Sequence, residues 1–440
     1  MGMEILAVLM VVSLFALILA GIPVPFALAA SGVAFGIVGF GEDLFSLLPH
    51  RIYGVATNYS LLAIPLFVFM GVLLEKSRLA ERMLDVVGHL AGRRAGGMAF
   101  AIVLVGMLMG ASTGIVAATV VTVGLITLPT LLRRNYDKGL ACGTICASGT
   151  LGQIIPPSLV LILLSDVTGS SVGTLFAAAL VPGLMLGALY LLYIGVLSLL
   201  RPQTMPPIPA DERATMPMGR LLLDLLRVVL PPIALIVAVL GSIIGGVAAP
   251  TEAASMGALG GLVLVAVTGR LSWSVLRDTV ISTFKITGMT LFVLMMAQVF
   301  SLAFRGLGGD DLIDQLFEFL PGGVWGALAF MMVLLFLLGF FLDWIEITYI
   351  VLPLTLPFFV REGVDIVWLC ILVALNLQTS FLTPPFGWSL FYLRGVAPAG
   401  VTTGDIYRGV LPFIGIQMLG LGLVMAFPGI ATWLPRAVGW

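Results

Sequence analysis

The sequence contains few charged residues. Asp, Glu, Lys and Arg make up only 10% of its 440 residues, whereas soluble domains contain roughly 25%. Because 60% of the residues are hydrophobic, there are too few polar side chains to cover a surface that faces water. The composition excludes a soluble protein and predicts an all-α integral membrane protein that lies in a lipid bilayer.

Histidine and cysteine are also scarce, which excludes several kinds of site. The two histidines, His50 and His89, lie far along the chain from Cys142, Cys146 and Cys370, so we expect neither a metal cluster nor a disulfide framework. An intramembrane protease needs a Ser–His dyad or two membrane aspartates, which the sequence does not offer, so we expect no enzyme. The net charge of −1 argues against a nucleic-acid partner. The sequence has neither a ring of charged residues nor a repeated carbonyl filter motif, and this disfavours an ion channel.

Glycine and proline are abundant, with 52 Gly and 25 Pro. These residues concentrate where membrane helices cross closely, kink or break, so we expect broken helices. A span needs about 20 apolar residues. Two series of apolar segments lie on either side of a Pro-rich stretch, and they cover 4–20, 22–40, 55–74, 98–131, 140–164 and 172–200, then 228–245, 248–268, 286–304, 325–360, 366–391 and 409–433.

The two series share motifs at a nearly constant offset. Leu66-Phe-Val-Phe-Met70 recurs as Leu291-Phe-Val-Leu-Met295, 225 residues later, and Pro156-Pro157 recurs as Pro384-Pro385, 228 residues later. Such an internal duplication is a signature of transporters. The sequence therefore predicts a first repeat over 1–200, a cytoplasmic linker over 201–226, and a second repeat over 227–440, each with about five spans and one re-entrant hairpin.

Charge indicates where the hairpins enter. The segments 98–131 and 325–360 are too long for one span and too short for two spans with a loop. Basic residues flank the first on both sides, whereas mainly acidic residues flank the second. By the positive-inside rule, the first hairpin enters from the cytoplasm and the second from outside, so the repeats are inverted. With both chain termini in the periplasm, all but four of the 21 Lys and Arg are cytoplasmic; the four are Arg51, Arg305, Arg361 and Arg436.

Candidate Na⁺ ligands lie at the breaks of the first repeat. The first hairpin turns near 110–114, where Ser112 and Thr113 offer hydroxyls. The next span is interrupted by glycines and a Pro pair, which leave helix carbonyls without partners. Oxygen atoms of this kind suit Na⁺, and the candidates there are Gly149, Thr150 and Gly152.

The second repeat offers an equivalent set that includes an acidic residue. Asp343 lies inside an otherwise apolar hairpin, where a charge is costly unless it has a partner or a wet cavity. We expect Asn376, Thr379 and Thr383 of the following broken span to face it and to complete a Na⁺ site. A structural helix cap is the alternative role for Asp343, and the hydroxyls could instead bond back to their own helix.

In their order and spacing these motifs resemble the large membrane subunit of tripartite ATP-independent periplasmic (TRAP) transporters, of the dicarboxylate-permease M type. The resemblance covers essentially the whole chain and rests on Gly21-Ile-Pro-Val-Pro25, Ser112, Ile155-Pro-Pro-Ser158, Ala249-Pro-Thr-Glu-Ala253, Phe341-Leu-Asp343 and Thr383-Pro-Pro-Phe-Gly387. It implies an elevator mechanism, in which the hairpins and broken spans move as one body against a scaffold. Within the matching motifs, we expect Ser112, Pro156, Pro157, Thr383 and Pro384 to contact the substrate.

The resemblance also implies the function and the partners. It implies Na⁺-coupled import of a small organic acid across a bacterial inner membrane, together with a separate small four-span subunit and a periplasmic substrate-binding protein. Helix ends can present positive dipoles to a carboxylate without a buried Arg, which fits the lack of Lys and Arg within the apolar segments. The alternative is a standalone Na⁺- or H⁺-coupled carboxylate transporter of related architecture.

Overall fold

The computed structural model describes residues 2–209 and 218–440, and these residues form helices without any strand. The all-helical fold predicted from composition is confirmed. The main helices are α1 (Met3–Leu19), α2 (Val24–Phe40), α3 (Asp43–Ala56), α4 (Ala63–Lys76), α5 (Leu79–Ala91), α6 (Gly97–Thr113), α7 (Val116–Arg133), α8 (Lys138–Thr150), α9 (Leu159–Thr168), α10 (Val172–Leu200), α12 (Met218–Asp224), α13 (Leu230–Ile244), α14 (Pro250–Val267), α15 (Trp273–Gly306), α16 (Gly309–Phe319), α17 (Gly323–Leu338), α18 (Trp344–Arg361), α19 (Ile366–Leu382), α20 (Trp388–Val396), α21 (Thr403–Ala426) and α22 (Gly429–Ala437). Short helical turns η1 (Tyr59–Leu62), η2 (Leu151–Gln153), η3 (Pro202–Thr204) and η4 (Leu225–Val229) lie between them.

Several of these helices can cross a bilayer. Within the described residues, eight helices are long and apolar enough to span a membrane. Shorter apolar helices, including α1, α2, α6 and α19, add to them. Helices α16 and α17 together are apolar enough for one span but meet at an angle of 113°. The chain is thus a multi-pass membrane protein.

Helix breaks divide both long apolar segments. In the first, α6 ends before Gly114, whose φ of +62° lies in the left-handed region that favours glycine. In the second, α17 ends at Leu338 and α18 begins at Trp344. Helix α7 begins at 116 and α18 at 344, which is the 228-residue offset of the Pro motifs. Re-entry of these helix pairs into the membrane, and inversion of the repeats, stay predictions.

The two spans that follow are interrupted at their Pro pairs. Helix α8 is separated from α9 by η2 and the Pro156-Pro157 segment, and α19 is separated from α20 by the Pro384-Pro385 segment. Both Pro–Pro bonds are cis. Proline lacks the backbone N–H that a continuing helix needs, so each pair ends the helix before it.

The sequence did not indicate three amphipathic helices, α3, α5 and α16. Each mixes charged and apolar residues within 11 to 14 positions, so a search for long apolar runs passes over them. The predicted linker at 201–226 is only partly described. Residues 210–217 lie outside the described residues, and α12 begins at 218 and continues through η4 into α13.

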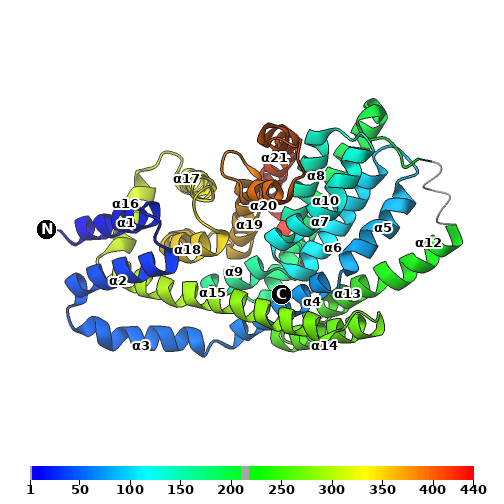
Figure 1. Ribbon diagram of the computed structural model, residues 1–440. Coiled ribbons are helices and arrows are strands. Elements are labelled where there is room, and N and C mark those ends of the chain that lie inside the picture. Colours follow the sequence, from blue (N-terminus) through cyan, green and yellow to red (C-terminus); the bar gives the residue numbers. More distant parts are fainter. Residues whose placement is uncertain (1, 210–217) are drawn as a thin grey trace.

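The helices pack in two groups (Figure 1). The hairpin group consists of α6–α9 and α17–α21, in which α8 contacts α6, α7, α19 and α21. The peripheral group consists of α2–α4 and α13–α15, in which the long helix α15 contacts α2, α3 and α4. The groups touch where α4 contacts α6 and where α15 contacts α18. This division is what an elevator would require, although movement stays a prediction.

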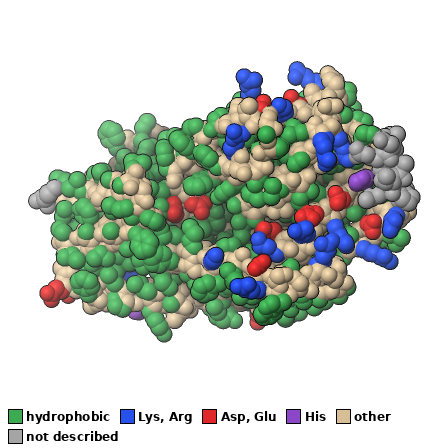
Figure 2. Space-filling model, viewed as in Figure 1, with side chains coloured by type: hydrophobic (Ala, Val, Ile, Leu, Met, Phe, Trp, Pro, Cys, Tyr) green, Lys and Arg blue, Asp and Glu red, His purple; other side chains and the backbone are tan. Residues whose placement is uncertain are grey.

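Charged side chains are unevenly distributed over the surface. In Figure 2 hydrophobic side chains cover most of the visible face, and Lys and Arg gather on the half where α5 and α12 lie. A chain with basic residues at one end is what the positive-inside rule predicts for an oriented membrane protein.

Candidate functional site

The first hairpin and the first broken span meet through two glycines. A Cβ added to Gly110 of α6 would lie 2.5 Å from the Cα of Gly152 in η2. No larger residue fits such a contact without moving the backbone. The structure therefore brings the predicted residues around 110–114 and 149–152 together.

The hydroxyls of this region are buried and bond locally. Ser112 donates to the carbonyl of Met109 at 2.8 Å, and the hydroxyl of Thr113 lies 3.3 Å from that of Thr119. Thr150 donates to the carbonyl of Ala147 at 2.9 Å. These bonds use hydroxyl hydrogens, so the oxygen lone pairs can still accept or coordinate. Pro156 and Pro157 are also buried.

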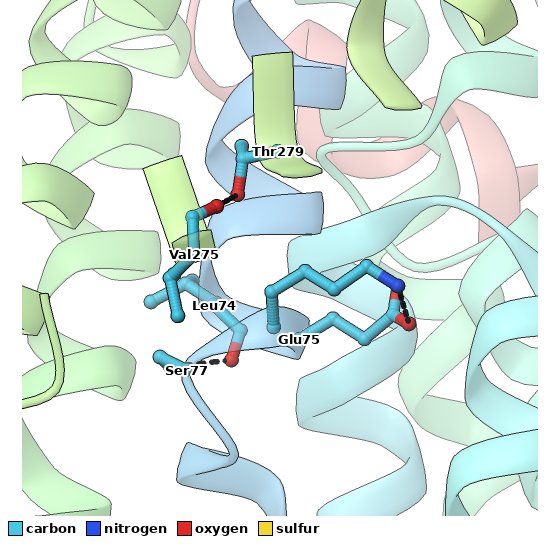
Figure 3. A network of polar contacts seen from close by, with 6 residues as sticks. Leu74, Glu75, Ser77, Val275 and Thr279 are labelled. Carbon is cyan, nitrogen blue, oxygen red and sulfur yellow. Dashed lines mark hydrogen bonds and ion pairs between the residues drawn. The ribbon is translucent and has the colours of Figure 1, made fainter. Parts of the chain in front are cut away.

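Helix α4 of the peripheral group crosses this hairpin tip. A Cβ on Gly71 would collide with the Cα of Thr113 and the carbonyl oxygen of Ser112. Glu75, one turn further along α4, lines a small cavity together with Ser112 and Thr113. Figure 3 shows the Glu75 side chain extending away from Val275 and Thr279 of α15, and its carboxylate lies 3.9 Å from the ammonium of Lys76. No local sequence pattern marks Glu75 as part of this site, because it lies more than 30 positions before the hairpin tip.

In the second hairpin, Asp343 is the N-cap of α18. Its Oδ1 accepts from the backbone N–H of Trp344 at 2.8 Å, and the backbone N–H of Asp343 donates to Glu346 at 3.0 Å. The Asp343 side chain also accepts from the backbone N–H of Glu346, so these two residues bond reciprocally in a capping box. The alternative role considered for Asp343 is therefore present in the structure. A carboxylate has about four lone-pair sites, so capping does not use all of the acceptor capacity of Asp343.

The other predicted residues of the second repeat lie on α19. Asn376 donates to the carbonyl of Met332 on α17 at 2.6 Å, and so fixes α19 against the hairpin. Thr379 and Thr383 donate to carbonyls of their own helix at 2.8 and 2.7 Å, as the second alternative anticipated. Gly339 packs on the side chain of Ser380, where a Cβ would collide with its hydroxyl.

The two halves of the candidate site differ in how far the rest of the chain covers them. The breaks of the first half are buried, whereas Phe341 and Phe386 of the second half are 55% and 44% exposed. Their rings lie 5.6 Å apart and join the hairpin tip to the Pro384 segment. Thr383 and Pro384 beside them are half-buried. This half of the site is therefore at the surface of the chain.

A buried polar cluster lies between α8, α10, α19 and α21. The amide nitrogen of Gln417 donates to the hydroxyl of Thr150 at 3.2 Å, and Tyr190 and Gln378 lie beside them. The hydroxyl of Tyr190 faces Thr150, Gln378 and Gln417. Within the described chain, however, this hydroxyl, the amide of Gln378 and the amide oxygen of Gln417 form no hydrogen bond of good geometry. An unpaired buried polar group costs roughly 1–3 kcal/mol. Only Thr150 was predicted, because the other residues are isolated polar positions in separate helices.

A cation here would have to be held mainly by neutral oxygen atoms. Among the described residues, no group of three or more His, Cys, Asp or Glu side chains could hold a metal ion. Hydroxyl, amide and carbonyl oxygens are the remaining ligands, together with the carboxylates of Asp343 and Glu346 in the second half and of Glu75 beside the first. Such a set suits a monovalent hard cation better than Mg²⁺ or Ca²⁺, which usually recruit more carboxylates.

Comparisons with known proteins identify the family. Residues 11–430 match the family described as "Tripartite ATP-independent periplasmic transporter, DctM component". The C4-dicarboxylate TRAP transporter large permease protein DctM of Pseudomonas aeruginosa is 31% identical over 92% of this chain and 93% of its own length. The isethionate TRAP transporter permease protein DctMQ of Oleidesulfovibrio alaskensis is 29% identical over 94% of this chain and 64% of its own length.

A solved structure supports the fold. The YdaH transporter of Alcanivorax borkumensis superposes with a TM-score of 0.60 over 89% of this chain and 90% of its own length, at 16% identity. At that sequence identity the superposition supports the fold but carries no information on function. The sequence relationships go further, because the family match covers nearly the whole chain. The chain therefore belongs to the DctM family, as the large permease of a tripartite ATP-independent periplasmic transporter.

Proposed function

We propose that this chain imports a small organic acid, driven by Na⁺, as the large permease of a binding-protein-dependent transporter. The proposal rests on the contact between interrupted helices in each half of the site. In the first half, α6 and η2 touch through Gly110 and Gly152. In the second half, the hairpin packs on α19 at Ser380. Broken helices in a membrane protein present dipole ends and free carbonyls to substrates and ions.

The nature of the cargo follows from the family and from the chemistry of the breaks. The Pseudomonas relative is named for C4-dicarboxylates and the Oleidesulfovibrio relative for isethionate. Both names denote small organic anions. Helix N-termini favour anions without a buried cationic side chain. The N-terminus of α18 is already capped by the carboxylates of Asp343 and Glu346, so in the second half of the site the anion would lie beside it, at the Pro384 segment. We assign substrate contact to this half, at Thr383 and Pro384, and to Ser112, Pro156 and Pro157 of the first.

Na⁺ is the proposed coupling ion. In the first half its ligands are drawn from Ser112, Thr113, Gly149, Thr150 and Gly152. In the second they are drawn from Asp343, Asn376, Thr379 and Thr383. The buried amide oxygens of Gln378 and Gln417, unpaired beside Thr150, support the same assignment because they need an electropositive partner.

Members of this family work with a small membrane subunit and a substrate-binding protein. We propose that this chain uses a small four-span subunit made as a separate polypeptide and a periplasmic binding protein that delivers the anion. The bacterial inner membrane is then its location, with both termini in the periplasm.

Uptake in proteoliposomes tests the proposal. Radiolabelled succinate and isethionate serve as probes, with this chain, the small subunit and the binding protein added together or omitted in turn. We expect accumulation only when all three are present. Strong accumulation with this chain alone would contradict the tripartite function and favour a standalone carboxylate carrier.

A further inference from the structure

A large cavity lies between the two helix groups. Its volume is about 1240 Å³, which is larger than the roughly 300–1,000 Å³ of a typical small-molecule pocket. Helix α3 and the end of α15 form one wall, and the second half of α18 and the end of α9 form the other. We call this space the outer cavity, because the predicted topology puts all four segments on the periplasmic side.

Arginines from three helices line the outer cavity. Arg51 comes from α3, Arg305 from α15 and Arg361 from α18, and His50 of α3 lies beside Arg51 in the lining. The predicted topology leaves only four Lys or Arg outside the cytoplasm, and three of those four line this one cavity. Basic residues are normally sparse in loops outside the cytoplasm. The clustering of three arginines in one periplasmic cavity therefore indicates that the cavity itself uses their positive charge.

The positive charge is only partly compensated within the chain. The guanidinium of Arg361 lies 2.5 Å from the carboxylate of Asp314, and that of Arg305 lies 3.8 Å from Asp310 and donates to the carbonyl of Pro353. Asp166 is the carboxylate that lines the cavity, and both its oxygens accept hydrogen bonds, from Asn58 and Tyr349.

Arg51 is the cation that these bonds leave available. It is exposed, and among the described residues it has no ion pair or side-chain hydrogen bond. Apolar side chains that include Val55 and Leu302 also line the cavity. Their dielectric constant is lower than that of water, so the electric field of the Arg51 guanidinium is focused into the cavity. An anion that enters would gain most from Arg51, because that charge is not shared with a carboxylate.

We propose that the outer cavity is an anion-collecting vestibule, in which Arg51, with Arg305 and Arg361 behind it, concentrates a small carboxylate or sulfonate before it reaches the hairpin breaks. The identity of the anion as the transported cargo rests on the proposed function. The vestibule's attraction for small anions does not, and it can be measured without transport. Clefts lined by one sign of charge raise local ligand concentration and association rates by roughly 10–10³-fold.

A cysteine placed in the cavity reports this potential. Gly54 lines the cavity, and a Cβ there meets no atom within 4 Å, so Gly54→Cys should be tolerated. Gly429→Cys on α22 is the matched control, since it also meets open space and lies outside the cavity lining. The three native cysteines are buried. The full chain is reconstituted in phosphatidylcholine nanodiscs and treated with either the anionic sulfonatoethyl or the cationic trimethylammonium-ethyl methanethiosulfonate.

The result is the ratio of the anionic to the cationic reaction rate, normalised to free cysteine. We expect this ratio to be about tenfold higher at Gly54→Cys than at Gly429→Cys. Adding Arg51→Gln should lower it about fivefold, whereas Arg51→Lys, which keeps the charge and controls for folding, should preserve it. Equal ratios at the two cysteines, or a ratio unchanged by Arg51→Gln, would overturn the proposal.

Protection experiments identify the kind of anion. We expect succinate to slow the anionic reagent at Gly54→Cys in neutral nanodiscs, with the effect lost in Arg51→Gln. Protection by phosphatidylglycerol in the nanodisc but not by succinate would make the cavity a lipid-headgroup site and would overturn the vestibule. If succinate protects but the complete transporter accumulates no anion, the proposed function fails while the vestibule stands.

Discussion

The side-chain amide of Asn58 donates to the carboxylate of Asp166 at 2.5 Å, and this bond joins the two helix groups. Asn58 precedes η1 and α4 in the peripheral group, whereas Asp166 lies on α9 in the hairpin group. The other carboxylate oxygen of Asp166 accepts from Tyr349 on α18 at 3.0 Å. If the hairpin group moves as one body, Asp166 and Tyr349 move together and the bond to Asn58 must break.

The first prediction is that Asn58→Asp weakens the junction between the groups. Asn58 also caps η1 through its side-chain oxygen, which accepts from the backbone of Ser60 at 3.0 Å. Aspartate keeps that oxygen but replaces the amide donor with a charge facing Asp166. Hydrogen bonds to charged groups contribute about 1.5–3 kcal/mol, so we expect roughly a tenfold or larger shift in the population of this arrangement.

Spin labels on exposed residues of α3 and α18, at Tyr53 and Val360, measure the separation of the groups. Asn58→Asp should add a second distance population, and Ser60→Ala, which leaves the bond intact, should not. Identical distance distributions in Asn58→Asp and the parent protein would show that this bond does not hold the groups together.

The second prediction concerns the contact between Gly110 and Gly152. Gly110→Ala inserts a methyl group against the Cα of Gly152, so we expect a loss of about 1–3 kcal/mol of stability and near-complete loss of uptake. Gly415→Ala on α21 is the control, because an added Cβ meets open space there. Alanine should stabilise that helix by up to about 1 kcal/mol. Equal melting temperatures for the two variants would contradict this packing.

The third prediction concerns the buried amide of Gln378. Leucine removes unpaired polar atoms from a fully buried site, so Gln378→Leu should keep or raise stability in choline buffer. In the parent protein, Na⁺ at 100 times its Kd should add about 2.7 kcal/mol of stability, and Gln378→Leu should lose most of this increment. The melting temperature in Na⁺ and in choline gives both quantities.

Gln315→Leu on the surface of α16 is the matched control, and its response to Na⁺ should equal that of the parent. If Na⁺ stabilises Gln378→Leu as much as it stabilises the parent protein, the Gln378 amide is not an ion ligand and the cluster has a structural role.

The fourth prediction concerns topology. Arg93 and Glu318 are exposed and lie in regions assigned to opposite sides of the membrane. In intact cells, Glu318→Cys should react with an impermeant thiol reagent and Arg93→Cys should not, while both should react after the membrane is opened. The buried native cysteines provide little background. Labelling of Arg93→Cys from outside would reverse the predicted orientation of the hairpins.

The features that sequence predicted well are local ones. Pro156-Pro157 and Pro384-Pro385 interrupt their helices because proline itself removes a donor and blocks the preceding turn. Gly114 ends α6 because glycine accepts a left-handed backbone. The membrane class followed from composition alone, since polar surface was lacking.

The features that sequence missed depend on distant partners. Gln417 lies 267 positions from Thr150, and Asn58 lies 108 positions from Asp166, so neither pair leaves a local pattern. A single glutamine in an apolar helix looks the same whether it meets a partner or lipid. The amphipathic helix α3, which brings Arg51 to the outer cavity, is too short and too polar to resemble a span.

The last prediction concerns the proposed coupling of Na⁺ binding at Asp343 to the uptake of an organic anion. Asp343→Asn keeps an oxygen that can cap α18 but removes the charge. Asp365→Asn is the matched control, because Asp365 is likewise an N-cap, accepting from the backbone of Trp368 at 3.1 Å. Loss of Na⁺ dependence in Asp343→Asn alone therefore separates ion binding from helix capping.

The most direct measurement is anion uptake into proteoliposomes that contain both membrane subunits and the binding protein, with an inward Na⁺ gradient or an inward proton gradient applied separately. The Na⁺ gradient alone should drive accumulation. Asp343→Asn should shift the Na⁺ titration at least tenfold to higher concentration, about 1.4 kcal/mol, while Asp365→Asn leaves it unchanged. Accumulation driven by the proton gradient without Na⁺, or an unchanged titration in Asp343→Asn, would contradict the account.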